Sequence, residues 1–175
     1  MQKKYMNMSQ SHLYKWICLF FTMIVLSACG NDIKKDLIAL DQAMYESGMT
    51  ASNTQKLIQK AEQAQNIEAQ MQAAQEIHDQ FQVYNHAIAQ LDFQTNEVRT
   101  LRNELSDHNR QIISALDQML QLNLRTGIAL SPDQHQRAMQ TIERSQRQMQ
   151  QADDDIQMTT QKIQALGKDN GVNWR

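Results

Sequence analysis

Apolar residues recur at steps of three and four along most of the chain beyond residue 31. This spacing places them on one side of an α-helix, and its sustained alternation is typical of coiled-coil seams. The pattern predicts a short helix at about 32–46, a stripe over 57–91, another over 98–122 and a last helix over 132–166. We therefore expect an all-α fold: an antiparallel helical bundle in which a short N-terminal helix precedes three longer helices.

Two capping boxes mark expected helix starts. Ser52 stands three residues before Gln55, and Ser131 stands three residues before Gln134. In this motif the serine hydroxyl accepts from the backbone N–H of the third residue, whose side chain reaches back to the serine N–H. Pro132 suits the first helical position, where a missing N–H costs nothing. Helices are therefore expected to begin near residues 52 and 132.

Glycines mark the expected helix ends. Gly48 follows the first helix, and Thr126 with Gly127 follows the second apolar stripe. Gly167 follows the last seam residue, where a glycine commonly closes a helix in the left-handed conformation. The sequence therefore predicts a single helical domain over 29–167 and a flexible tail over 168–175.

Residues 52–126 contain neither glycine nor proline, which leaves two alternatives. A single helix of this length would extend about 110 Å and would expose Met71, Phe81 and Ile88. A break at Asp92–Glu97, where the seam shifts phase, would instead give separate helices that cover these side chains. We favour the compact bundle with this break. The alternative is one very long helix over about 52–126 with a returning C-terminal helix.

Composition agrees with an all-helical chain. There are five Gly and one Pro among 175 residues, and 27 Gln. Sandwiches, barrels and Rossmann folds need many more turn residues, whereas Gln is a good helix former. Composition therefore excludes β-rich and α/β folds.

The N-terminus has the layout of a secretory signal. Lys3, Lys4 and Lys15 precede a mostly apolar run over 16–26, and the first 15 residues contain no acid. A run of about eleven residues suits a signal peptide and is shorter than the roughly 20 residues of a membrane span. We therefore expect residues 1–28 to be a signal peptide.

The end of this signal, Leu26-Ser27-Ala28-Cys29, resembles the lipobox of bacterial lipoprotein precursors. The resemblance implies cleavage between Ala28 and Cys29, and acylation of the Cys29 thiol and then of its freed amine. Several acyl chains give stable membrane anchoring where one is marginal. In enterobacterial lipoproteins an Asp after the Cys favours inner-membrane retention. Gly30 stands there instead, which favours the outer membrane facing the periplasm.

Maturation changes the charge and thiol content of the chain. Losing residues 1–28 leaves 14 basic and 19 acidic residues, a net charge of −5. Cys18 leaves with the signal and Cys29 is acylated, so no thiol remains for a disulfide. An acidic body without a basic cluster has no electrostatic footprint for nucleic acid. The expected partners are the membrane, through acylated Cys29, and an envelope protein or a second copy, through the helix faces.

Few side chains of the mature chain lie in patterns that indicate catalysis or metal binding. The mature chain keeps His78, His86, His108 and His135, at spacings unlike the i, i+4 pairs of helical metal sites. The acidic run Asp153–Asp155 fits a solvated helix face better than a calcium loop. No nucleophile motif, phosphate-binding loop or paired-carboxylate site stands out. We therefore expect no catalytic residues, no metal, no cofactor and no enzymatic activity.

One further resemblance lies at the start of the last helix. Leu130–Gln134, with Ser131 in place of Thr, is similar to the Leu-Thr-x-x-Gln motif of Spy-like helical periplasmic chaperones. That family usually carries two copies, and Met49–Asn53 is at best a degenerate first copy. The resemblance implies a chaperone-like or stress-sensing bundle as the alternative function. The favoured prediction is a lipid-anchored envelope protein acting as a helical interaction or structural module.

Overall fold

The computed structural model describes residues 31–122 and 131–174, with the side chain of Ile67 left aside. Residues 31–46 are helical and are followed by the helices α2 (Ala51–Glu62), α3 (Ile67–Ala89), α4 (Asn96–Leu120) and α5 (Pro132–Asp169). These ranges contain no strand. The all-α bundle predicted from the apolar spacing is confirmed.

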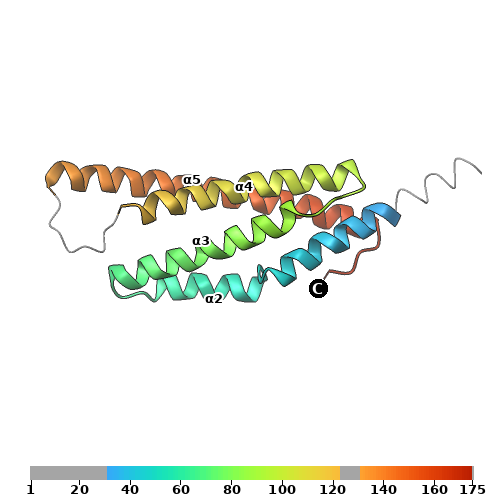
Figure 1. Cartoon of the computed structure of the whole chain (residues 1–175), viewed down its shortest axis with the longest axis horizontal. Coiled ribbons are helices and arrows are strands. Elements are labelled where there is room, and N and C mark those ends of the chain that lie inside the picture. Colours follow the sequence, from blue (N-terminus) through green and yellow to red (C-terminus); the bar gives the residue numbers. More distant parts are fainter. Residues whose placement is uncertain (1–30, 123–130, 175) are drawn as a thin grey trace, which may run out of the picture.

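The helices lie side by side along one long axis (Figure 1). Helix α5 has 38 residues and therefore extends about 57 Å. It packs on α4, α4 packs on α3, and α3 packs on α2. Helix 31–46 and α2 follow one another beside α3, where the Gln80 amide donates to the carbonyl oxygen of Ser47.

The break between α3 and α4 confirms the division predicted near 92–97, and the alternative of one helix over 52–126 is wrong. The turn has no glycine or proline because side chains from elsewhere hold it. Buried Asp36 of helix 31–46 accepts from the backbone N–H of Thr95 at 2.8 Å and from its hydroxyl at 2.7 Å. Asp36 thereby caps the start of α4 from a distance of 59 residues in sequence.

The other side of this turn is closed by Arg102. Its guanidinium donates to the carbonyl oxygens of Ile88 and Leu91, both at 3.1 Å, and lies 5.6 Å from the ring centroid of buried Phe93. The last carbonyls of a helix lack partners within it, and a cation there is favoured by the helix dipole. The α3 end is therefore satisfied by a side chain of α4.

A second break was not expected. The stripe over 57–91 divides into α2 and α3 at residues 63–66, and the Asn66 side chain accepts from the backbone N–H of Ala69 at 2.8 Å as the α3 N-cap. The expected box at Ser52 is also wrong, because Thr50 caps α2 by accepting from the Asn53 N–H at 3.3 Å. The bundle therefore has one more helix than predicted.

The start of α5 matches the prediction. Ser131 and Gln134 form the reciprocal capping box, at 2.9 and 3.3 Å, with Pro132 in the first turn. Gly48, at φ +75°, ends helix 31–46 as expected. Helix α4 ends at Leu120, and the stop predicted at Thr126–Gly127 lies outside the described residues.

The expected end at Gly167 is wrong, because α5 continues to Asp169 and the left-handed residue is Gly171, at φ +64°. The Val172 N–H donates to the Gly167 carbonyl at 2.9 Å and the Gly171 N–H to that of Lys168 at 3.2 Å, which is the Schellman pattern. Val172 is buried, and Trp174 packs against the core. Residues 168–174 therefore lie against the bundle, unlike the flexible tail expected there.

The core has two parts. The larger cluster joins helix 31–46, α3, α4, α5 and the C-terminal residues, and centres on Leu37, Ile88, Phe93 and Val98. The smaller cluster lies farther along α3, α4 and α5, around Ile112, Leu116 and Ala152. Alanine, serine and threonine fill several seam positions, which lets the helices approach closely.

Candidate functional site

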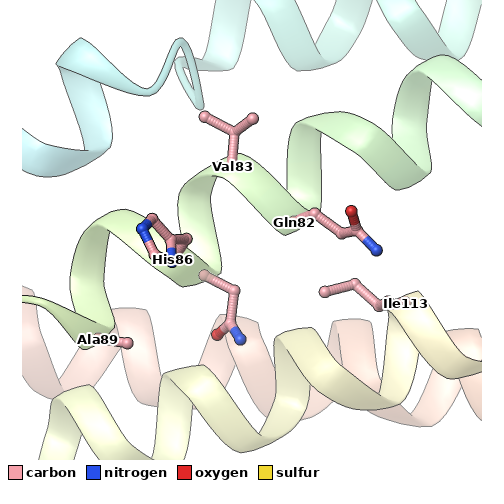
Figure 2. Close-up of a pocket in the computed structure, with 6 residues that line it drawn as sticks. Gln82, Val83, His86, Ala89 and Ile113 are labelled. Carbon is pink, nitrogen blue, oxygen red and sulfur yellow. The ribbon is translucent and has the colours of Figure 1, made fainter.

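An open groove runs between α3 and α4 (Figure 2). It has a volume of about 640 Å³ and is lined by Gln82, Val83, Asn85, His86, Ala89 and Ile113. Antiparallel packing of the two helices places Ile113 of α4 opposite this part of α3. Val83 is 55% exposed. The groove therefore presents apolar side chains beside amides and an imidazole.

A buried histidine joins the same two helices farther along. The Nε2 atom of His78 lies 3.0 Å from Oδ1 of Asp117 on α4, and its Nδ1 atom lies 3.0 Å from Oδ1 of Asp79. Each ring nitrogen therefore lies within hydrogen-bond distance of a carboxylate oxygen. Hydrogen bonds from His78 and then from Gln75 lower the pKa of Asp79 below its ordinary value of 3.8.

A smaller, more enclosed pocket lies beneath the C-terminal residues. It has a volume of about 160 Å³ and is walled by helix 31–46, α3, α4, α5 and Trp174. Its aromatic wall includes Tyr84, and burial raises the pKa of this phenol. Ligand pockets usually measure about 300–1,000 Å³. This pocket is therefore a gap in the core rather than a site for a large ligand.

Comparison with known proteins bears on the whole helical body. The family model described as Uncharacterised lipoprotein PM1805 matches residues 34–167, well over half of the chain. The chain belongs to this lipoprotein family. Neither the curated proteins nor the solved structures that were searched gave a match. Membership of a lipoprotein family makes this a lipid-anchored protein of the cell envelope.

The family match is independent of the lipobox. It begins at residue 34, after Cys29, and runs nearly to the end of α5. Ala28 and Cys29 lie outside the described residues, so cleavage and acylation at these positions stay predictions. None of the helices in the described ranges of this lipoprotein has the length and apolar character needed to cross a membrane.

The other histidines of the lipoprotein lie apart. His86 is exposed in the groove, His135 is exposed in the first turn of α5, and His108 has its Nδ1 atom 4.0 Å from Asp155. Over residues 31–122 and 131–174, no three His, Cys, Asp or Glu side chains gather as metal ligands do. The acids of 153–155 each accept a hydrogen bond from a nearby glutamine on the same helix.

The residues of the chaperone-like motif have a local role in the lipoprotein. Ser131 and Gln134 form the cap of α5, and Thr50 with Asn53 forms the start of α2. Both segments are therefore explained by helix capping alone.

The groove was not predicted, although its apolar residues leave a trace in the sequence. Val83 lies off the stripe that contains Phe81 and Tyr84, and Ile113 lies beside the seam residue Ile112. Apolar residues next to a seam widen it on one side. Two such residues on antiparallel neighbours are the signal that could have located the groove.

Proposed function

We propose that this protein is an envelope lipoprotein anchored through acylated Cys29, and that its bundle serves as a helical interaction module without catalysis of its own. The observation that carries this proposal is the agreement of two separate parts of the chain. The lipobox ends at Cys29, and the helical body from residue 34 matches a lipoprotein family. Gly30 after the cysteine supports the outer membrane, with the bundle facing the periplasm.

The α3–α4 groove is the proposed binding surface for a partner protein of the envelope. Its apolar residues come from two helices that pack on each other. Val83 exposes over half of its surface, and the surrounding Gln82, Asn85 and His86 can donate and accept hydrogen bonds. Apolar and hydrogen-bonding side chains therefore lie next to one another on this surface, as they do in protein interfaces.

Site-specific photocrosslinking in intact cells tests this surface. A photoreactive amino acid replaces Val83 in the groove, and the matched control replaces Met158 on α5, which is apolar and 54% exposed. The proposal predicts one discrete adduct from position 83 and none from position 158. The absence of an adduct from position 83, or the same adducts from both positions, contradicts it. Adducts with many unfolded polypeptides would favour a chaperone instead.

A further inference from the structure

Three segments meet at one end of the bundle: residues 31–35, the turn 91–95 and residues 168–171 at the end of α5 (Figure 1). Asp36 binds Thr95 across this end. A Cβ atom on Gly171 would lie 3.9 Å from the Nζ atom of Lys34, so the C-terminal residues lie beside the first described helix. We call these three segments the anchor end.

The anchor end lies very close to the proposed lipid attachment. Asn31 follows Cys29 by two residues, and two residues span at most about 7 Å. The zone of polar headgroups on each side of a bilayer is of a similar depth, about 5–8 Å. An acylated Cys29 therefore leaves no spacer that could hold the bundle away from the lipid.

Charge distinguishes the anchor end from the remainder of the body. Its three acids, Asp32, Asp92 and Asp169, are balanced by three bases, Lys34, Lys35 and Lys168. The mature chain as a whole carries −5, so the excess negative charge lies along the sides and at the opposite end. Anionic headgroups repel acidic surfaces. The neutral anchor end is therefore the surface of the bundle that can contact the headgroups.

The last residues of the chain turn back from the anchor end along the bundle (Figure 1). Trp174 is half-buried beside Gly167 and lines the same pocket as Leu40 and Met44 of helix 31–46. Its indole therefore belongs to the core, and the anchor end combines proximity to the lipid with neutral charge.

We propose that the anchor end rests directly on the lipid headgroups and that the bundle stands upright on the membrane. This inference rests on the proposed acylation of Cys29. Residues 133 and 168 of α5 are 35 helical positions apart, about 52 Å. The start of α5 is then held about 50 Å into the envelope, and the α3–α4 groove faces sideways between it and the membrane.

Energy transfer to the bilayer tests this arrangement in the acylated full-length lipoprotein. The protein is reconstituted in vesicles of phosphatidylethanolamine and phosphatidylglycerol that carry a headgroup-linked acceptor. A donor dye is attached at Lys168→Cys or, as the matched control on the same helix, at Asp133→Cys; both positions are exposed. The proposal predicts transfer several-fold stronger from position 168 than from position 133.

A spacer variant provides the second control. A Gly-Ser segment of about 16 residues, with a root-mean-square length of about 20–24 Å, is inserted between Gly30 and Asn31. Vesicle flotation persists, and transfer from position 168 falls towards that from position 133.

Three results would overturn the inference. Strong transfer from both positions means that the bundle lies flat. Weak transfer from both positions in a protein that floats with the vesicles means that the bundle is held off the membrane although it is anchored. A protein that does not float with the vesicles is not anchored, which contradicts both the proposed anchoring and the upright orientation. Flotation thus separates failure of the proposed function from failure of this inference.

Discussion

Replacing Gly167 by alanine adds one methyl group where the structure leaves no room for it. A Cβ atom there would lie 2.1 Å from Cζ2 and 2.8 Å from Cε2 of Trp174. Atoms cannot approach so closely, and Gly167 is buried inside α5 with the helix backbone fixed around it. Gly167→Ala therefore displaces the indole of Trp174 from the bundle.

Two opposing effects set the change in the free energy of unfolding. Alanine stabilises a helix interior by about 1 kcal/mol relative to glycine. Loss of a fully buried tryptophan costs about 3–5 kcal/mol, and since Trp174 is only half-buried, we take about 2–3 kcal/mol for its displacement. The displacement outweighs the helix propensity. We expect Gly167→Ala to destabilise the bundle by about 1–2 kcal/mol.

Urea denaturation of the chain beginning at Gly30 measures this effect. Trp174 is its only tryptophan, because Trp16 lies within the predicted signal peptide. Its emission should shift to longer wavelength in the folded Gly167→Ala variant. In a Trp174→Ala background no indole remains to displace, so Gly167→Ala should stabilise by about 1 kcal/mol. Destabilisation by a similar amount in both backgrounds would refute the reasoning.

Three further predictions concern polar side chains of the bundle. Asp36→Ala should destabilise the bundle by about 2–4 kcal/mol in urea denaturation, because two hydrogen bonds to a buried carboxylate are lost. Asp36→Asn should lower the free energy of unfolding by less. An equal loss in the two variants would argue against a role for the charge of Asp36. Asn109 is 1% exposed and neither amide atom has a partner, so Asn109→Leu should stabilise by about 1 kcal/mol; a lower midpoint would show that the larger side chain does not fit. The lowered pKa of Asp79 means that its contribution to stability is present above the ordinary value of 3.8 and is lost as pH falls through the lower, folded value. His78→Gln should raise this pKa back towards 3.8 in an NMR titration, and an unchanged Asp79 titration would exclude His78 as the cause.

Local features of the sequence predicted local features of the fold. The three-four spacing identified the helices, and Ser131 with Gln134 identified the start of α5, because capping involves neighbours along the chain. The end of α5 was misplaced because Gly167 is needed for contact with Trp174, and Gly171 has the left-handed conformation. A glycine in sequence does not say which of these two uses it serves.

Breaks held by distant residues were harder to locate. The α3–α4 turn was found from a phase shift of the seam, although its main cap is Asp36 of another helix. The α2–α3 break left the seam intact, and its only local sign is the polar stretch ending at Asn66. Seam continuity therefore does not establish helix continuity, because α2 packs back on α3, which in turn packs on α4.

The candidate sites also differ in whether they depend on neighbouring or on distant residues of the sequence. The lipobox at Cys29 is a contiguous motif, read directly from the sequence. The groove is lined by Val83 of α3 and Ile113 of α4, and which residues of the two helices share it depends on the register between α3 and α4. The bridge from His78 to Asp117 depends on that same register. Sequence analysis assigned His78 no role because its partner is 39 positions away.

The proposed anchoring requires acylation of Cys29, which metabolic labelling with tritiated palmitate measures. The wild-type chain is compared with Cys29→Ala, which keeps the rest of the signal and the whole helical body. We expect the wild-type protein to incorporate label, and Cys29→Ala to incorporate none and to accumulate at the precursor size. Absence of label from the wild-type protein, or equal label in both, would contradict the proposed anchoring.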